Sequence, residues 1–237
     1  MAQAPLVRIN KYLADKKYCT RKEADELIKK GRVTINGRTA ILGDKVSPSD
    51  TVATRFRPKT FRYFAYHKPR GIITHSAQQG ETEIKDAIDI EGSFPVGRLD
   101  KDSSGLIILT DDGRLTDALL NPAHEHEKEY EVLVSQRLPN NFQRRMERGV
   151  FIGEYHTKPC TVRITGDKKF TVTLTEGKKH QIRRMCDALG VAVAELKRTR
   201  IMNVKLGSLP KGTCRQLSGA ELHTLLHALS MDRPEPV

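Results

Sequence analysis

Apolar side chains near the start of the chain recur at helical spacing. They form two stripes, the first of Ile9, Tyr12 and Leu13 and the second of Ala24, Leu27 and Ile28. Spacings of three and four predict two amphipathic helices. Thr20 followed by Glu23 is a capping box, so we expect the second helix to begin there. Gly31 is the expected left-handed residue at its end.

After these helices the apolar period changes to two. Val33 and Ile35 alternate with polar residues, which predicts a strand, and Asn36-Gly37 is the strongest short signal for a hairpin. Further apolar residues are expected to complete a small sheet: Ile41, Val46 and Val52. The pattern therefore predicts a small module of two helices and a sheet.

Beyond residue 61, strand patterns outnumber helical ones. The expected strands cover 62–66, 106–109, 130–134 and 170–174. The expected helices are one opened by Pro139 with Phe142 and Met146 inward, one over 182–189 ended by Gly190, and one capped by Ser218 and Glu221. Hairpin-like strands with few interposed helices predict an α+β fold with a largely antiparallel mixed sheet. We expect a small module at 1–57, a linker at 58–61, a larger domain at 62–231 and a tail at 232–237.

The charge is large and unevenly placed. The 237 residues carry 41 Lys and Arg against 29 Asp and Glu, a net charge of +12. Residues 1–60 have a net charge of +8, residues 61–177 of −2 and residues 178–205 of +6. Two separate basic surfaces indicate a polyanionic partner, of which nucleic acid is the commonest. An anionic membrane surface is the alternative partner, but the sequence shows no long basic amphipathic helix that would bind to it.

The cysteines and histidines give little sign of metal or redox chemistry. Four cysteines stand singly, without a C-x-x-C pair, which fits a reducing cytoplasm. His124-Glu125-His126 lies in a charged stretch and is interpreted as solvated surface, so no metal is expected. The first ten residues lack the pattern of a signal peptide, and no apolar run approaches 18 residues.

Two polar segments are candidates for chemistry. Residues 94–105 form a glycine-bracketed loop that runs into the buried strand expected at 106–109. In an extended stretch, Arg98, Asp100 and Asp102 would point to one face. Residues 176–185 form a basic run. If this run is helical, the side chains of Arg183 and Arg184 point in different directions. A solvated turn and a solvated helix face are the alternatives on these local patterns alone.

The first module resembles an S4 domain. The resemblance is carried by the segments 8–13 (RINKYL), 20–24 (TRKEA) and 31–37 (GRVTING). Such modules occur in ribosomal proteins and RNA-modifying enzymes, where they bind structured RNA. The residues most like the family's RNA contacts are Arg8, Lys11, Arg21, Lys22 and Arg32.

The rest of the chain is similar to pseudouridine synthases. The matching motifs, in the family's order, are 68–71 (KPRG), 95–100 (PVGRLD), 109–113 (LTDDG), 128–132 (KEYEV), 180–185 (HQIRRM) and 206–207 (LG). The S4 module in front indicates the RsuA-type subgroup, which modifies ribosomal RNA. Residues 198–203 (RTRIMN) resemble RluF-type members, which act on large-subunit rRNA and can also act on a tRNA anticodon loop. Cys214 departs from the family, which commonly has Trp there.

This resemblance implies an isomerisation that needs no cofactor. Asp100 is implied as the catalytic carboxylate, and Arg183 as the guanidinium that pairs with it and keeps it ionised. Tyr130 would cover the flipped uracil. The residues implied to contact RNA or to pack beneath the site are Lys68, Arg98, Arg184 and Leu206. Whether Asp100 attacks the base, attacks C1′ or guides an elimination stays open.

Three alternatives remain at this point. The target could be small-subunit rRNA instead of large-subunit rRNA. A non-enzymatic S4-type protein of RNA binding or ribosome assembly would explain the charge but leave Asp100 idle. A base-removing enzyme would also use a carboxylate near C1′ but would release uracil. For the favoured interpretation we expect a cytoplasmic monomer that binds rRNA, and tRNA as a further substrate, without a membrane or a small-molecule cofactor.

Overall fold

The computed structural model of the chain describes residues 6–16, 18–55 and 60–231. Contacts divide it into two compact units between Phe61 and Arg62, and Met231 groups with the first unit. Residues 58 and 59 of the expected linker and the whole expected tail, 232–237, lie outside the described residues. The domain boundaries stay a prediction.

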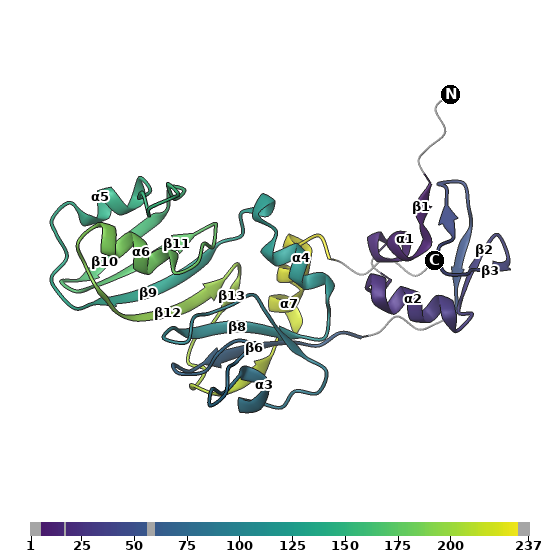
Figure 1. The fold of residues 1–237 in the computed structure, drawn as a ribbon, viewed down its shortest axis with the longest axis horizontal. Helices are drawn as coiled ribbons and strands as arrows, with labels where there is room; N and C mark the ends of the chain where they lie inside the picture. The colour runs from purple at the N-terminus through teal and green to yellow at the C-terminus, as the bar shows by residue number, and fades with distance from the viewer. Residues whose placement is uncertain (1–5, 17, 56–59, 232–237) are drawn as a thin grey trace, which may run out of the picture. The chain divides into compact units, whose positions relative to one another are not determined.

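Over residues 6–16 and 18–55, the first unit shows two helices and two small sheets (Figure 1). Its elements are β1 (Val7–Arg8), α1 (Ile9–Asp15), α2 (Arg21–Lys29), β2 (Val33–Ile35), β3 (Arg38–Thr39), β4 (Lys45–Val46) and β5 (Val52–Thr54). The strands pair as β3-β2-β5 and, separately, as β1-β4. Both helices bury their apolar stripes against β2 and β4 in one core, which includes Ile9, Leu13, Ala24, Ile28 and Val33.

Local signals in this unit are confirmed at the helix ends and the hairpin. The Thr20 hydroxyl accepts from the Glu23 backbone N–H at 3.2 Å, and the Glu23 carboxylate accepts from the Thr20 N–H at 2.9 Å. Gly31 has φ +65° at the end of α2. Asn36 and Gly37, with φ values of +49° and +81°, form the turn between β2 and β3. Positive φ at both central residues is what a two-residue hairpin requires.

The expected sheet partners after β3 are partly wrong. Val52 pairs with Ile35 as expected, but Val46 pairs with Val7 in the other sheet, and Ile41 is 62% exposed in a turn. The physical reason is Asp44, whose carboxylate accepts from the Ile41 N–H at 2.9 Å and so closes the turn. This bond ends the strand before Ile41.

The second unit is built on one nine-stranded sheet. Its strands are β6 (Tyr63–Lys68), β7 (Phe94–Val96), β8 (Ser104–Thr110), β9 (Lys128–Val134), β10 (Thr161–Gly166), β11 (Lys169–Leu174), β12 (Val193–Ile201), β13 (Val204–Lys205) and β14 (Cys214–Gln216). Its helices are α3 (Ile84–Ala87), α4 (Arg114–Leu120), the 3₁₀ turn η1 (Pro122–His124), α5 (Phe142–Glu147), α6 (Gln181–Ala188) and α7 (Gly219–Ala228).

The sheet order is β10-β11-β9-β12-β8-β6-β14, with β13 on β12 and β7 on β8. Its strands pair antiparallel except at β12 and β8, which run parallel. The predicted α+β class and largely antiparallel mixed sheet are therefore confirmed. The parallel junction needs Gly105, because a Cβ there would lie 2.2 Å from the Arg198 carbonyl oxygen. Gly105 has φ +113°, so it suits the position on conformational grounds as well.

Helices α5 and α6 cover one face of β9, β10, β11 and β12 (Figure 1). Phe142 of α5 meets Phe170 of β11 edge to face, with ring centroids 4.9 Å apart. Ile182, Met185 and Cys186 of α6 join the same core, as their helical spacing predicts. Helix α6 also contacts β12, the strand that pairs in parallel with β8.

Two helix starts differ from the sequence prediction. Helix α5 begins at Phe142 instead of Pro139, with Asn141 as its N-cap. Ser218 does precede α7, but its side chain caps no backbone group there. Glu221 instead accepts from both terminal nitrogens of Arg215, at 2.6 and 2.7 Å. A guanidinium within reach gives the carboxylate a stronger partner than a backbone N–H.

Candidate active site

Asp100 lies in the loop between β7 and β8, where the backbone turns. The Ser103 N–H donates to the Asp100 carbonyl at 3.0 Å, so residues 100–103 form a turn. The side chain of Asp100 is 36% exposed, whereas Leu99 before it and Ser103 after it are buried. The expectation that Asp102 shares one extended face with Arg98 and Asp100 is therefore wrong.

Thr74 fixes the backbone directly before Asp100. Its hydroxyl donates to the Leu99 carbonyl at 2.9 Å and accepts from the Leu99 N–H at 3.0 Å. Thr74 is only 3% exposed, so water does not compete for these bonds. Next to it, the Gly71 N–H donates to the Lys101 carbonyl at 2.8 Å. The loop is thus held on both sides of Asp100.

Arg198 of β12 joins the two ends of the same loop. Its Nε donates to the Leu106 carbonyl at 2.7 Å, and its Nη1 lies 3.4 Å from the Arg98 carbonyl. Arg198 is 4% exposed, and its Nη2 has no hydrogen-bond partner within the part of the chain that is described. Sequence reasoning missed this residue, because an arginine in a charged strand is usually solvated. Alternation with Leu196 was the available signal that it points inward.

Lys68 at the end of β6 is fully buried. Its ammonium donates to the carbonyls of Pro69 at 3.0 Å and Ile72 at 2.5 Å. Burial lowers the pKa of Lys68 to about 8, although the negative charges of Asp100 and Asp102 oppose this shift. The interpretation of Lys68 as an RNA contact is wrong for this structure. It supplies a buried positive charge near Asp100 instead.

His180 is the side chain that lies against the Asp100 carboxylate. The distance from its Nδ1 to Asp100 Oδ2 is 3.5 Å. His180 is the N-cap of α6 and has a left-handed backbone, with φ +53° and ψ +27°. Non-glycine residues in this region are strained and cluster at functional sites. The sequence motif contained His180, but nothing in the sequence assigned it this contact.

Arg183 is near the loop but does not pair with Asp100. Its Nη2 donates to the Asp102 carbonyl at 3.1 Å and its Nη1 to the Val193 carbonyl at 3.2 Å. Among the described residues, the Asp100 carboxylate has no ion pair with Arg183, so the expected pairing is wrong here. Arg184 leaves the helix in another direction and donates to the Ile152 carbonyl. That bond occupies part of the guanidinium expected to bind phosphate.

Tyr130 lies on the same row of the sheet as Arg198 and Gly105. Tyr130 pairs with Arg198, and Arg198 pairs with Gly105. Residues paired across antiparallel strands share a face, so Tyr130 is on the face from which Arg198 reaches the loop. Leu206 is 2% exposed, and its N–H donates to the Thr199 carbonyl at 2.8 Å. The roles given to Tyr130 and Leu206 stay predictions.

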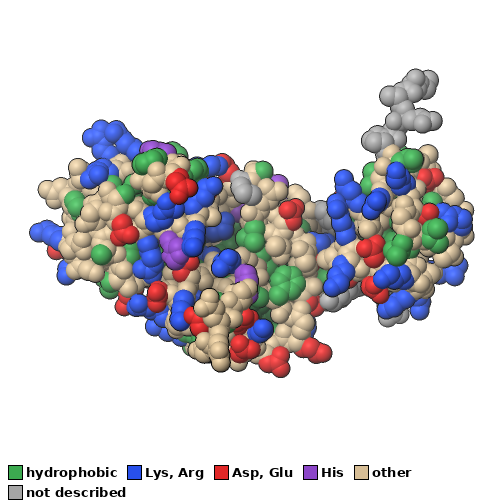
Figure 2. Space-filling model, in the orientation of Figure 1, with side chains coloured by type: hydrophobic (Ala, Val, Ile, Leu, Met, Phe, Trp, Pro, Cys, Tyr) green, Lys and Arg blue, Asp and Glu red, His purple; other side chains and the backbone are tan. Residues whose placement is uncertain are grey.

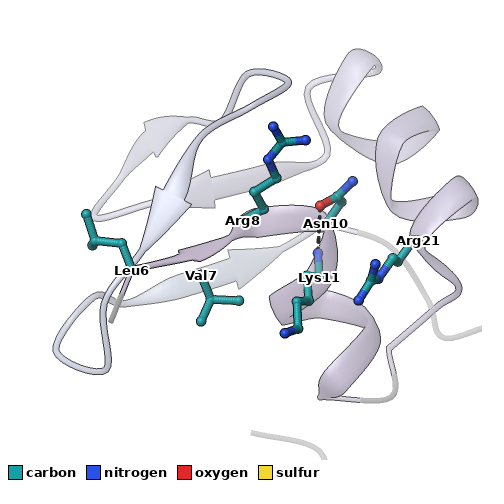
Figure 3. Close-up of a pocket in the computed structure, with 6 residues that line it drawn as sticks. All are labelled: Leu6, Val7, Arg8, Asn10, Lys11 and Arg21. Carbon is teal, nitrogen blue, oxygen red and sulfur yellow. Dashed lines mark hydrogen bonds between the residues drawn. The ribbon is translucent and has the colours of Figure 1, made fainter. Parts of the chain in front are cut away.

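The first unit carries a basic groove (Figure 3). It encloses about 380 Å³ and is lined by Leu6, Val7, Arg8, Asn10, Lys11 and Arg21. The Asn10 side chain is held in place because its Oδ1 accepts from the Lys11 backbone N–H at 2.7 Å and its Nδ2 donates to the Asp25 carboxylate at 2.9 Å. Three of the five predicted RNA contacts therefore meet in one groove. The other two, Lys22 and Arg32, are exposed outside it.

The histidine pair considered for a metal has other partners. His126 contacts the Ala118 carbonyl at 3.0 Å, and Glu125 pairs with Lys158. Over residues 6–16, 18–55 and 60–231, no three His, Cys, Asp or Glu side chains are arranged to hold a metal ion. In the same ranges no helix is long and apolar enough to cross a membrane.

A basic groove in the first unit and a tethered carboxylate loop in the second are features that an RNA-modifying enzyme requires, and comparison with known proteins gives the family. The chain belongs to the RNA pseudouridylate synthase family, which it matches over residues 62–188, and an S4 domain matches residues 7–52. The similarity predicted from the motifs is therefore confirmed, and the chain is an RNA uridine isomerase.

Relatives of known name span almost the whole chain. The dual-specificity RNA pseudouridine synthase RluF of Escherichia coli K12 is 39% identical over 97% of this chain and 81% of its own. The ribosomal large subunit pseudouridine synthase B of Bacillus subtilis is 35% identical over 92% of this chain and 95% of its own. A crystal structure of a pseudouridylate synthase superposes with a TM-score of 0.67 at 29% identity, over 94% of this chain and 99% of that one.

Proposed function

We propose that this enzyme converts a uridine of large-subunit ribosomal RNA to pseudouridine and acts on a tRNA as a second substrate. The observation that carries the rRNA proposal is the similarity over most of both chains to a synthase named for the ribosomal large subunit. The similarity to a synthase named for dual specificity supports a second RNA. The groove with Arg8, Lys11 and Arg21 offers the cations that a folded RNA needs.

The reaction sets what the site must do. The bond from uracil N1 to ribose C1′ breaks, the base turns, and C1′ joins C5, which loses its proton while N1 gains one. The nucleotide is neither oxidised nor reduced overall. The uridine must first leave its stack, at a cost of a few kcal/mol. The site then needs a group beside the ribose and a surface that keeps the detached base in place.

Asp100 is the group we assign to the glycosidic bond. An ionised carboxylate can act there as a nucleophile or as a base. The surroundings of Asp100 supply positive charge from the Lys68 ammonium and contact from the His180 imidazole, while Thr74 and Arg198 fix the loop backbone through Leu99 and Arg98. A carboxylate held in this way needs little rearrangement before it reacts.

Tyr130 and Arg183 are assigned to the base and its surroundings. Tyr130 is half-buried on the face of the sheet from which Arg198 reaches the Asp100 loop, so it can cover the detached uracil. Arg183 holds the Asp102 carbonyl and thereby the far side of the turn. Arg98 is exposed beside Asp100 and is free to meet the RNA backbone. Leu206 is buried, and we assign it to pack beneath this region.

We further propose that the enzyme works as a cytoplasmic monomer without a cofactor. Cys160, Cys186 and Cys214 form no disulfide, and burial raises the pKa of Cys160 to about 11 and that of Cys186 to about 12. Thiols of this kind are protonated at neutral pH and act as small apolar side chains, as in a reducing compartment. Cys214 stands on β14 opposite Tyr66, where the family commonly has Trp.

The test uses transcripts labelled with tritium at uracil C5. Large-subunit rRNA, small-subunit rRNA and tRNA transcripts are offered separately to the full-length protein. Release of tritium to water from large-subunit rRNA, and from tRNA at a lower rate, is expected. Release from small-subunit rRNA alone would overturn the target. Binding without release would indicate a non-enzymatic RNA-binding protein, and liberated uracil a base-removing enzyme.

A further inference from the structure

A second basic surface lies on the catalytic unit, away from the Asp100 loop. Arg144, Arg145 and Arg148 are exposed on α5 and its C-cap, and we call these three residues the arginine ridge. Figure 2 shows Lys and Arg side chains gathered over the position of α5 in Figure 1. On a helix, residues at these spacings project from one side, opposite the buried Phe142 and Met146.

No salt bridge neutralises the ridge within the described part of the chain. No hydrogen bond or ion pair joins any of its three guanidinium groups to a described residue. The acidic residue of the helix, Glu147, forms hydrogen bonds with other residues. It accepts from the Gln143 amide at 3.2 Å and from the Val162 N–H of β10 at 3.3 Å. Its negative charge is thus directed to the sheet.

This arrangement is unfavourable for the protein by itself. Like charges three and four positions apart on a helix repel each other. The helix dipole favours a cation in the last turn, but that effect is screened by salt and weak for so short a helix. A polyanion would remove the repulsion. Arginine is the side chain best suited to it, since its planar fork makes paired hydrogen bonds to phosphate oxygens.

We propose that the arginine ridge binds phosphates of the RNA substrate outside the target nucleotide. This inference rests on the proposed function, because RNA is the polyanion that the same unit must engage. Strand β9 leads from Lys128, two residues before Tyr130, to Val134, from which the chain continues into α5. Seven residues of strand span roughly 20 Å. The ridge therefore binds RNA that extends past the target nucleotide.

The test measures binding of the full-length protein to a large-subunit rRNA transcript between about 50 and 200 mM salt. The variant is Arg144→Gln, Arg145→Gln and Arg148→Gln together. Three lost contacts should reduce the slope of log affinity against log salt by about 2, at roughly 0.7 per contact. Over that range the wild type should then lose roughly 20-fold more affinity than the variant.

Two controls separate charge at this place from charge in general. Arg144→Lys, Arg145→Lys and Arg148→Lys together keep the positive charge and should keep the slope. Lys85→Gln, Lys205→Gln and Lys211→Gln remove three exposed cations elsewhere in the same unit and should leave it unchanged. If the first variant fails to fold, the double variant Arg145→Gln with Arg148→Gln should lower the slope by about 1.4.

Equal slopes for the wild type and the ridge variant would overturn the inference, and so would an equal loss in the variant with the three distant lysines changed. Because binding is measured without turnover, failure of this inference can be distinguished from failure of the proposed function. A wild-type protein that binds the transcript but releases no tritium would contradict the function and still decide the role of the ridge.

Discussion

At the scale of single residues, His180 at the N-cap of α6 is the side chain that lies against the Asp100 carboxylate. His180 places its imidazole 3.5 Å from the carboxylate, and its backbone is left-handed. Glycine adopts that backbone without strain, whereas alanine does not. Stability and activity can therefore be separated by two substitutions at this position.

We predict that His180→Gly folds at least as stably as the wild type and that His180→Ala is about 1 kcal/mol less stable than His180→Gly. Both variants lack the imidazole, so both should lose turnover to the same extent. Urea unfolding and single-turnover tritium release measure the two effects. Wild-type turnover by His180→Gly would show that the imidazole does not position Asp100.

Lys68 gives a pH-dependent prediction because burial lowers its pKa from 10.5 to about 8. Between these values the unfolded chain keeps a proton that the folded protein has released, so folding becomes more favourable as the pH rises. Relative to Lys68→Met, which has no such proton, the wild type should gain on the order of 2–3 kcal/mol between pH 7.5 and 10.

Urea unfolding of the wild type and Lys68→Met at several pH values checks this gain. Activity should also change, because deprotonation near pH 8 removes a positive charge beside Asp100. The wild type should therefore lose turnover above pH 8, whereas the weaker activity of Lys68→Met should not depend on pH in this range. A stability difference that stays constant from pH 7.5 to 10 would mean that the pKa of Lys68 is not lowered in the folded protein.

At the scale of elements, the loop between β7 and β8 is positioned by residues far from it in the sequence. Thr74 bonds both polar backbone groups of Leu99, and a valine would leave both unpaired in a buried place. Such a loss costs about 1–3 kcal/mol. Displacement of a catalytic group by about 1 Å can cost on the order of a hundredfold in rate.

Thr74→Val is therefore predicted to lower kcat by about 10- to 100-fold with little change in RNA affinity. Thr74→Ser keeps the hydroxyl and should keep most of the rate. Rapid-quench tritium release at saturating RNA gives kcat for the three proteins. Equal rates for the valine and serine variants would show that the hydroxyl does not hold the loop.

The sequence predicted these elements well where the signal is local, and less well where it is not. The capping box at Thr20, the Asn36-Gly37 turn and the stripe of α6 depend on neighbours in the chain, and all are confirmed. The contacts of Arg183 and Arg198 depend on which strands meet. A β8–β12 junction cannot be deduced from periodicity, so the pairing of Arg183 was misassigned and the role of Arg198 was missed.

At the scale of the whole molecule, the net charge of +12 is concentrated where RNA must be held. In the first unit Arg8, Lys11 and Arg21 share one groove. Changing all three to Gln should reduce the salt slope of RNA binding by about 2 and leave kcat at saturating RNA unchanged. Filter binding and turnover measure these quantities. The matched control removes three exposed cations outside the groove, Lys16, Arg38 and Lys45.

If the control lowers the slope as much as the groove variant does, the unit binds RNA by diffuse charge and not through this groove. If the groove and the arginine ridge both contact one RNA, their effects on the slope should add, because they are carried by separate units. The combined variant should then lose about 4 from the slope.

The central claim is that the Asp100 carboxylate carries out the isomerisation. Asp100→Asn keeps the shape of the side chain and removes its charge, and the turn at 100–103 depends on backbone groups that the change leaves intact. We predict a folded protein with wild-type RNA affinity and no release of tritium from C5-labelled large-subunit rRNA. Appreciable release by folded Asp100→Asn protein would contradict the account.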